Sequence, residues 1–208
     1  MLHPLKGSVM TRVVSNLSMS LDGFIEDSAG NVGPLFDWYT AGPVETATAN
    51  ETIDHRQSEE DADFTQEMAG QLGALITGRK LFDVAGGWQG AHPTGVPVVV
   101  LTHTVPSVDE WPFDRSRTTF VTEGGIEAAV ATARELADGK DIVIASPTVA
   151  QQALDAQLLD AITVDLVPVL LGAGTPYWAN LQSAPVLLEN PTVRQGNRVT
   201  HLSYDVIR

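Results

Sequence analysis

Short apolar runs alternate along the chain with stretches of helical periodicity. Each apolar run has the length of a buried strand and ends in polar or glycine residues. We therefore predict strands at 13–17, 74–77, 96–101, 118–122, 141–145 and 162–171. Apolar residues recur with helical spacing at 64–72, 126–136 and 147–159. Strands that alternate with helices are typical of an α/β fold.

The apolar runs are too continuous for a sheet with one face in water. They predict helices on both faces, and therefore a three-layer α/β/α domain with a mixed, mostly parallel sheet. At the end of the chain, 186–189 and 199–207 predict an antiparallel hairpin with its turn at 195–198.

Residues 26–60 form the longest stretch without a clear period and are rich in Gly, Pro, Asp and Thr. So long a loop in a compact domain is usually functional. At its end, the acidic residues Glu59, Glu60, Asp61 and Asp63 indicate a solvated helix start that the helix dipole favours.

Composition narrows the function classes. The chain has 208 residues, and 26 acidic against 12 basic side chains give a net charge of −14, which disfavours nucleic acid and membrane partners. It has no cysteine, and its five histidines show no metal-ligand spacing, so we expect no disulfide and no metal site. No run is long and apolar enough to span a membrane, and the start has no signal-peptide pattern. We expect a cytoplasmic protein with one domain at 10–208, where residues 1–9, before Met10, form a disordered or dispensable extension.

Ligands of open α/β sheets bind beyond the carboxyl ends of the strands. This rule brings five segments to one candidate cleft: Asp22, 77–79, 101–103, 145–148 and 172–174. The segment Thr77, Gly78, Arg79 and Lys80 is the most informative, because a buried strand ends there and two cations open a helix. Backbone N–H groups and positive charge at one point suit a phosphorylated cofactor. A solvated basic helix start is the alternative interpretation.

Four motifs follow one another along the chain: SLDGFI at 20–25, TGRKLFD at 77–83, PVVVLTH at 97–103 and VPVLLGAG at 167–174. In this order they resemble the dihydrofolate-reductase-like superfamily. The resemblance is closer to the branch that includes the reductase (C-terminal) domain of the bifunctional riboflavin-biosynthesis deaminase/reductase, and it covers about 12–208. The zinc-ligand pattern of the deaminase half does not occur in this sequence. The resemblance implies a homodimer that uses NADPH and acts on a small molecule.

The resemblance also implies roles for individual residues. The cofactor-binding residues would be Thr77, Gly78, Arg79, Lys80, Leu101, Thr102, His103, Ala145, Ser146, Pro147, Thr148, Gly172 and Gly174. Arg79 or Lys80 would hold the 2′-phosphate. The alternative to a cofactor-binding role for 101–103 is a polar pair that satisfies itself at the end of a strand. For Gly172 and Gly174 the alternative is a tight turn.

The chain departs from the family at the pyrophosphate. Members usually carry a Gly-Gly pair where this sequence has Ala145, Ser146, Pro147 and Thr148. Glycine lets the backbone approach a phosphate without a Cβ, whereas proline has no N–H to donate. Ser146 could donate a hydroxyl hydrogen bond instead. This departure puts cofactor binding in doubt.

Asp22 is the candidate catalytic group, because a carboxylate after the first strand could orient a ring nitrogen or assist protonation. The alternative is a turn, since Asp-Gly is a favoured turn pair. Ser20, Trp38, Tyr39 and Trp88 are the candidate substrate-binding residues. For the aromatic ones, stacking on a planar heterocycle competes with simple packing on the core.

Two hypotheses follow. The first is an NADPH-dependent reductase of a pyrimidine-like or pterin-like heterocycle, similar to 5-amino-6-(5-phosphoribosylamino)uracil reductase or dihydrofolate reductase. The second is a non-catalytic or repurposed member of the fold that binds a nucleotide or another metabolite.

Overall fold

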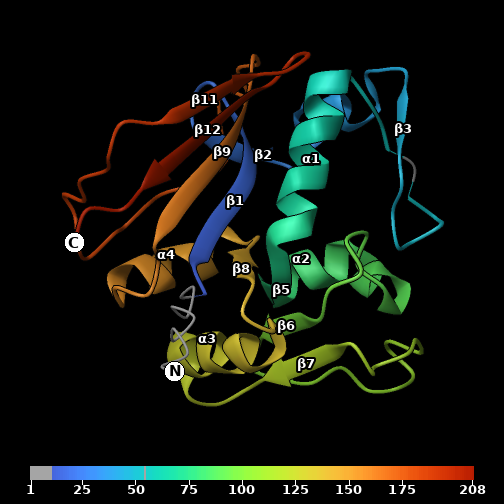
Figure 1. The fold of residues 1–208 in the computed structure, drawn as a ribbon. Coiled ribbons are helices and arrows are strands. Elements are labelled where there is room, and N and C mark those ends of the chain that lie inside the picture. Colours follow the sequence, from blue (N-terminus) through green and yellow to red (C-terminus); the bar gives the residue numbers. More distant parts are fainter. Residues whose placement is uncertain (1–10, 54) are drawn as a thin grey trace, which may run out of the picture.

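A central eight-stranded sheet dominates the computed structural model, which describes residues 11–53 and 55–208 (Figure 1). Its order is β11-β12-β9-β1-β8-β5-β6-β7. Strands β9, β1, β8, β5, β6 and β7 pair in parallel, and β12 and β11 add an antiparallel end. The strands are Val13–Ser20 (β1), Leu72–Gly78 (β5), Val98–Leu101 (β6), Thr118–Val121 (β7), Asp141–Ile144 (β8), Ala161–Val167 (β9), Thr192–Gln195 (β11) and Thr200–Asp205 (β12). The predicted mixed, mostly parallel sheet is confirmed.

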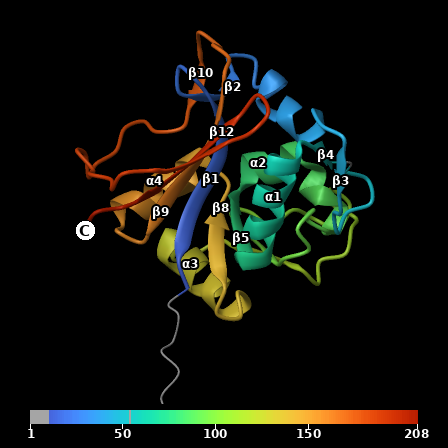
Figure 2. The ribbon, with the colours of Figure 1, turned by 45° about the horizontal axis from the view of Figure 1, so that its top comes forward.

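Helices cover both faces of the sheet. Helices α3 (Gly125–Leu136) and α4 (Pro147–Asp155) lie on one side, and α1 (Glu59–Gln71) and α2 (Arg79–Val84) on the other (Figure 2). Strand alternation explains this, because Val13 and Ile142 belong to the core with α3 and α4, whereas Val14 and Val143 belong to the core with α2. The three-layer α/β/α architecture is therefore confirmed.

The stretch 26–60 is not the irregular loop that its composition suggested. It contains the end of β2 (Phe24–Asp27), the 3-10 helix η1 (Gly33–Thr40), and the small hairpin of β3 (Val44–Thr46) and β4 (His55–Gln57). These elements are too short to show a period in the sequence. Buried Leu35 and Trp38 anchor η1 on the sheet.

The C-terminal hairpin also differs from its prediction. Its first strand is β11, not 186–189, which contributes an isolated bridge between Leu188 and Val206. All four residues of β11 are exposed, so they show no apolar pattern. Strand β9 ends at Val167 rather than at 171, because Pro168 has no N–H for the ladder.

Some expectations cannot be compared with the structure. The proposed extension at 1–9 and Met10 lie outside the described residues. Within 11–53 and 55–208, no helix has the length and apolar character needed to cross a membrane. The same residues contain no group of three or more His, Asp and Glu side chains arranged to hold a metal ion.

Candidate functional site

One large cavity, about 1380 Å³ in volume, extends from the carboxyl ends of the parallel strands to the space beneath α1. We call its first region the strand-end part; it is lined by residues that follow β5, β6 and β8. The second region, the α1 part, is lined by α1, η1 and the middle of β1 and β9. Of the five segments predicted to meet at one cleft, 78–79, 101–103 and 145–148 line this cavity, whereas Thr77, Asp22 and 172–174 do not.

Gly78 and Ser146 line the strand-end part, and the neighbouring Thr77 contacts Ser146. The Ser146 hydroxyl accepts a hydrogen bond from the Gly78 N–H (2.9 Å) and lies 3.0 Å from the Thr77 hydroxyl. Thr77 is fully buried and does not line the cavity. Ser146 therefore joins two loops, and the Gly78 N–H that we expected to face a phosphate already has a partner.

Arg79 and Lys80 bring positive charge to the same region, and both line the cavity. The Arg79 guanidinium binds Asp83 (2.7 Å) and the Thr104 carbonyl (2.9 Å), which hold it in place. Lys80 forms an ion pair with Glu26. Burial would raise the pKa of Glu26, but hydrogen bonds from Lys80 and Thr175 outweigh it, so that pKa is lowered and the carboxylate is charged.

Helix α4 opens onto the cavity with Ala145, Ser146, Pro147 and Thr148, all of which line it. Ser146 is the N-cap residue but makes no side-chain cap. The first N–H groups of a helix have no partner within the helix, so those of Thr148 and Val149 are available donors there. Proline at the first position removes one donor, as the sequence suggested.

The segment after β6 reaches the cavity as expected. Leu101, Thr102 and His103 all line it. Thr102 is buried, and its hydroxyl donates to the Thr104 carbonyl (3.0 Å), so this side chain fixes the turn after the strand. His103 is exposed at the cavity rim.

The contacts of Asp22 are those of a turn residue, the alternative to the catalytic role that the sequence left open. Its carboxylate accepts hydrogen bonds from the Ser20 hydroxyl (2.6 Å) and from the backbone N–H groups of Leu171 (3.1 Å) and Gly172 (2.7 Å). These hydrogen bonds lower the pKa of Asp22, the one from Ser20 most strongly, so the carboxylate stays ionised. Neither Asp22, Ser20, Gly172 nor Gly174 lines the cavity. This group of residues ties the first strand to the turn after β9.

Gly174 is needed for close backbone packing rather than for contact with a ligand. A Cβ at this position would lie 1.8 Å from the Glu26 carbonyl oxygen. Glycine therefore lets β10 (Gly174–Pro176) pair closely with β2.

Trp38 and Tyr39 do line the cavity, in its α1 part. Their rings stack on each other at 3.8 Å, and the Trp38 indole N–H donates to the Ser18 hydroxyl (3.2 Å). Burial, together with the charge of Asp165, raises the pKa of Tyr39. The rings pack on the core and also form a wall of the cavity, so stacking on a heterocycle stays a prediction.

Trp88 lines the cavity from an unusual turn, η2 (Gly86–Gly90). Trp88 (φ 48°) and Gln89 (φ 54°) both have left-handed backbone, which costs roughly 1–2 kcal/mol per residue outside glycine. The Asn50 amide stabilises the turn by donating to the carbonyls of Trp88 (2.8 Å) and Ala91 (2.8 Å). The rings of Trp88 and His92 contact each other edge to face, with their centroids 4.7 Å apart.

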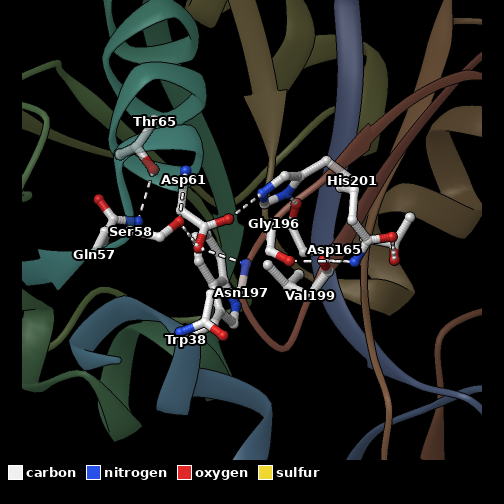
Figure 3. A network of polar contacts seen from close by, with 12 residues as sticks. Trp38, Gln57, Ser58, Asp61, Thr65, Asp165, Gly196, Asn197, Val199 and His201 are labelled. Carbon is white, nitrogen blue, oxygen red and sulfur yellow. Dashed lines mark hydrogen bonds and ion pairs between the residues drawn. The ribbon is translucent and has the colours of Figure 1, made fainter. Parts of the chain in front are cut away.

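The sequence analysis missed a polar group in the α1 part. Asn16 on β1 and Asp165 on β9 both line the cavity, and His201 on β12 contacts Asp165 (Figure 3). A charged residue within the apolar run of β9 was a signal for this group, because an unpaired buried charge is very costly. Asp61 belongs to it as well, so the expectation of a wholly solvated acidic cluster is wrong at that residue, which is fully buried.

The donors of the strand-end part fit a phosphorylated cofactor. Arg79 and Lys80 supply charge, and the first-turn N–H groups of α4 supply backbone donors. The cavity exceeds the roughly 300–1,000 Å³ typical of a single small ligand. Fold and site together define a three-layer α/β/α protein with one long cavity at the carboxyl ends of its parallel strands.

The comparisons identify the family. Residues 11–201 match the RibD C-terminal domain, so the chain belongs to that family. A candidate riboflavin biosynthesis protein from Shewanella sp. PV-4 is 21% identical, with a TM-score of 0.67 over 95% of this chain and 100% of that one. Acinetobacter baumannii RibD is 15% identical, with a TM-score of 0.67 over 96% of this chain and 59% of its own length.

A dihydrofolate reductase is also among the structural relatives. The Enterococcus faecalis enzyme, in a complex with NADP(H), is 13% identical, with a TM-score of 0.57 over 97% of this chain and 98% of that one. At such identities these relatives show the fold alone. No curated protein sequence matches the chain significantly.

Proposed function

We propose that this protein is an NADPH-dependent reductase of a small planar heterocycle. The observation that carries the proposal is the shape of the cavity, which joins the strand-end part, with Arg79 and Lys80, to an aromatic and polar α1 part without a break. Membership of the RibD C-terminal domain family and the NADP(H) complex of the Enterococcus relative support it.

In this proposal the cofactor lies with its phosphates in the strand-end part. Arg79 and Lys80 hold phosphate oxygens, and the N–H groups of Thr148 and Val149 donate to them. When bound, the nicotinamide supplies the hydride. The Trp38 and Tyr39 wall excludes water from the α1 part and orients the substrate by its ring face.

A second candidate function is ligand binding without hydride transfer. It rests on the loss of two backbone N–H groups that the family pattern would offer to the cofactor phosphates. The Gly78 N–H is bound by Ser146, and Pro147 has none. A re-posed or weakened pyrophosphate contact would leave a nucleotide-binding protein with the same fold.

Titration with NADPH and NADH, followed by nicotinamide fluorescence, tests the first function. We expect NADPH to bind more tightly than NADH. Arg79→Ala should weaken NADPH binding about 10- to 100-fold, the worth of one charge-assisted hydrogen bond, and leave NADH binding almost unchanged. Arg134→Ala removes an exposed cation that does not line the cavity, and is the matched control.

The two functions then separate in a second assay. Substrate-dependent oxidation of NADPH, lost in Arg79→Ala, supports the reductase. Tight binding of NADPH with no oxidation across a set of pyrimidines and pterins supports the binding protein. If neither nucleotide binds, both proposals about this cofactor fail.

A further inference from the structure

Both cations of the strand-end part are paired with carboxylates of the chain itself. Arg79 binds Asp83 of the same helix, and Lys80 binds Glu26 of β2. The two pairs are not equivalent. The Asp83 side chain is 52% exposed and does not line the cavity, whereas that of Glu26 is only 11% exposed and lines it. A carboxylate therefore stands in the wall of the region that we assign to phosphates.

The position of Glu26 is fixed by its surroundings. Its backbone pairs with Thr175 in the ladder of β2 and β10, which approach closely because residue 174 is glycine. Its side-chain oxygen Oε1 accepts hydrogen bonds from the Thr175 hydroxyl and from the Lys80 ammonium. Glu26 is thus a rigid part of the cavity wall, and Lys80 reaches across to it from α2.

Lys80 is the movable partner of this ion pair. Its side chain is 68% exposed, and a lysine ammonium sits on a flexible four-carbon stem. The ammonium has three donors, but a phosphate bound beside the Glu26 carboxylate would meet a like charge. Lys80 can therefore serve a phosphate fully only when it leaves Glu26.

The strand order separates the tasks of the two cations. The order β6-β5-β8-β1 places the start of α4, which follows β8, between the ends of β6 and β1. Arg79 contacts the Thr104 carbonyl, after β6, whereas Lys80 contacts Glu26, after β1. Lys80 is thus directed to the α4 side, where the diphosphate of a nucleotide would lie, and Arg79 to the opposite side.

The diphosphate depends on Lys80 more than usual in this chain. The Gly78 N–H is bound by Ser146, and Pro147 has no N–H. The first-turn N–H groups of α4 and the Lys80 ammonium are then the donors on that side of the cavity. Whether Lys80 is free or held by Glu26 should therefore weigh heavily in the affinity for the diphosphate.

We propose that Glu26 is a specificity-determining residue, which competes with the diphosphate of a nicotinamide nucleotide for Lys80. A phosphate gains Lys80 only when the ion pair opens, so Glu26 weakens every ligand that carries this diphosphate by the same factor. Discrimination between such ligands then falls to Arg79. The inference rests on the proposed function, because the diphosphate is that of the proposed cofactor.

Glu26→Gln is the decisive variant. Glutamine has the same shape and can still accept from the Thr175 hydroxyl, but it has no charge to hold Lys80. NADPH and NADH are titrated against the full chain, followed by nicotinamide fluorescence. The Kd of each should fall about 5-fold, the worth of one partly exposed ion pair. The ratio of the two Kd values should stay the same, because both nucleotides carry the diphosphate.

Glu67→Gln is the matched control. It removes the same charge from a carboxylate that is also in an ion pair, with Arg194, but does not line the cavity. Neither Kd should change in this variant. A gain as large as that of Glu26→Gln would mean that net charge alone controls binding, and would overturn the inference.

Lys80→Met separates competition from simple repulsion. Repulsion between Glu26 and a phosphate does not need Lys80, whereas competition does. Glu26→Gln should therefore improve binding less in the Lys80→Met background than in the wild type, and an equal gain in both overturns the inference. Lys80→Met alone should weaken NADPH and NADH alike. If Glu26→Gln does not fold, unchanged nucleotide binding by Lys80→Met overturns the inference instead.

Inorganic pyrophosphate, titrated by calorimetry against the same samples, distinguishes this inference from the proposed function. If neither nucleotide binds but pyrophosphate binds Glu26→Gln more tightly than the wild type, the competition for Lys80 holds and the proposed cofactor is wrong. Unchanged nucleotide binding in a folded Glu26→Gln, or a gain confined to NADPH, overturns the inference and leaves the proposed function intact. No binding of any of the three probes at about 10 mM overturns both.

Discussion

Acidification from pH 7 to pH 5 should destabilise the fold through His92. This side chain is half-buried, and its Nδ1 atom accepts a hydrogen bond from the Thr94 N–H (3.3 Å), which is possible only while Nδ1 carries no proton. Burial, and to a smaller extent the nearby His55, lower the pKa of His92 from 6.5 to about 4. Between these two pKa values, His92 therefore binds a proton in the unfolded chain but not in the folded one.

The size of the effect follows from the two pKa values. A group with a lowered pKa in the folded state favours the unfolded state as the pH falls below its unfolded pKa, here 6.5. Integrated between pH 7 and pH 5, this one group costs roughly 2 kcal/mol of unfolding free energy. The loss stops below about pH 4, where both states hold the proton.

Urea unfolding of the wild type and of His92→Asn at pH 7 and pH 5 measures this contribution. Asparagine places an acceptor oxygen near the position of Nδ1 but does not titrate. We expect the wild type to lose roughly 2 kcal/mol more than the variant over this interval. Equal losses would show that His92 titrates normally in the folded state, and would refute the reasoning from burial.

Three further predictions concern stability. Burial lowers the pKa of His201, but the two carboxylates that contact its ring nitrogens outweigh burial and raise that pKa in the folded state. Its contribution to the free energy of unfolding is therefore complete below pH 6.5 and is lost as the pH rises through the raised value. In urea unfolding, the stability of His201→Gln should therefore approach that of the wild type at alkaline pH. A difference that does not change with pH would contradict this. Gly174→Ala should lower the free energy of unfolding by about 3 kcal/mol, because the new Cβ would collide with the β2 backbone. Gly172→Ala is the control: its Cβ has open space, so it should cost only about 1 kcal/mol, from the left-handed backbone at φ +76°. Ser146→Ala leaves the Gly78 N–H without its partner and should cost about 1–2 kcal/mol in thermal unfolding; an unchanged Tm would mean that water replaces the hydroxyl.

Local patterns were sufficient where the physics is local. The apolar runs that became β5, β6 and β8 are continuous because both faces of each strand are buried, and such runs can be recognised in any sequence. The carboxyl ends of these strands meet at one edge of a parallel sheet by geometry, so 78–79, 101–103 and 145–148 could be assigned to one cleft from the sequence, whereas Asp22 and 172–174, assigned by the same rule, do not line it. Strand β11 was missed because an exposed edge strand has no apolar pattern.

The roles of individual polar side chains could not be read in the same way. Asp22 was a reasonable candidate for chemistry, but its carboxylate binds N–H groups of Leu171 and Gly172, about 150 residues away. The hydroxyl of Ser146 was a possible donor to a phosphate, and the fold also makes it the acceptor for the Gly78 N–H. A polar group is satisfied by whichever partner the fold brings within about 3 Å, and sequence spacing does not contain that information.

The sequence by itself determined the architecture and the location of the strand-end part of the cavity. Apolar periodicity fixes which faces are buried, and strand direction fixes where the loops gather. Only the tertiary structure decided the chemistry of the cavity wall, because the contacts of His201 join Asp61, 140 residues away, and Asp165 on the neighbouring strand. The energy of such contacts depends on exclusion of water and on distances of a few ångströms, and both exist only once the chain has folded.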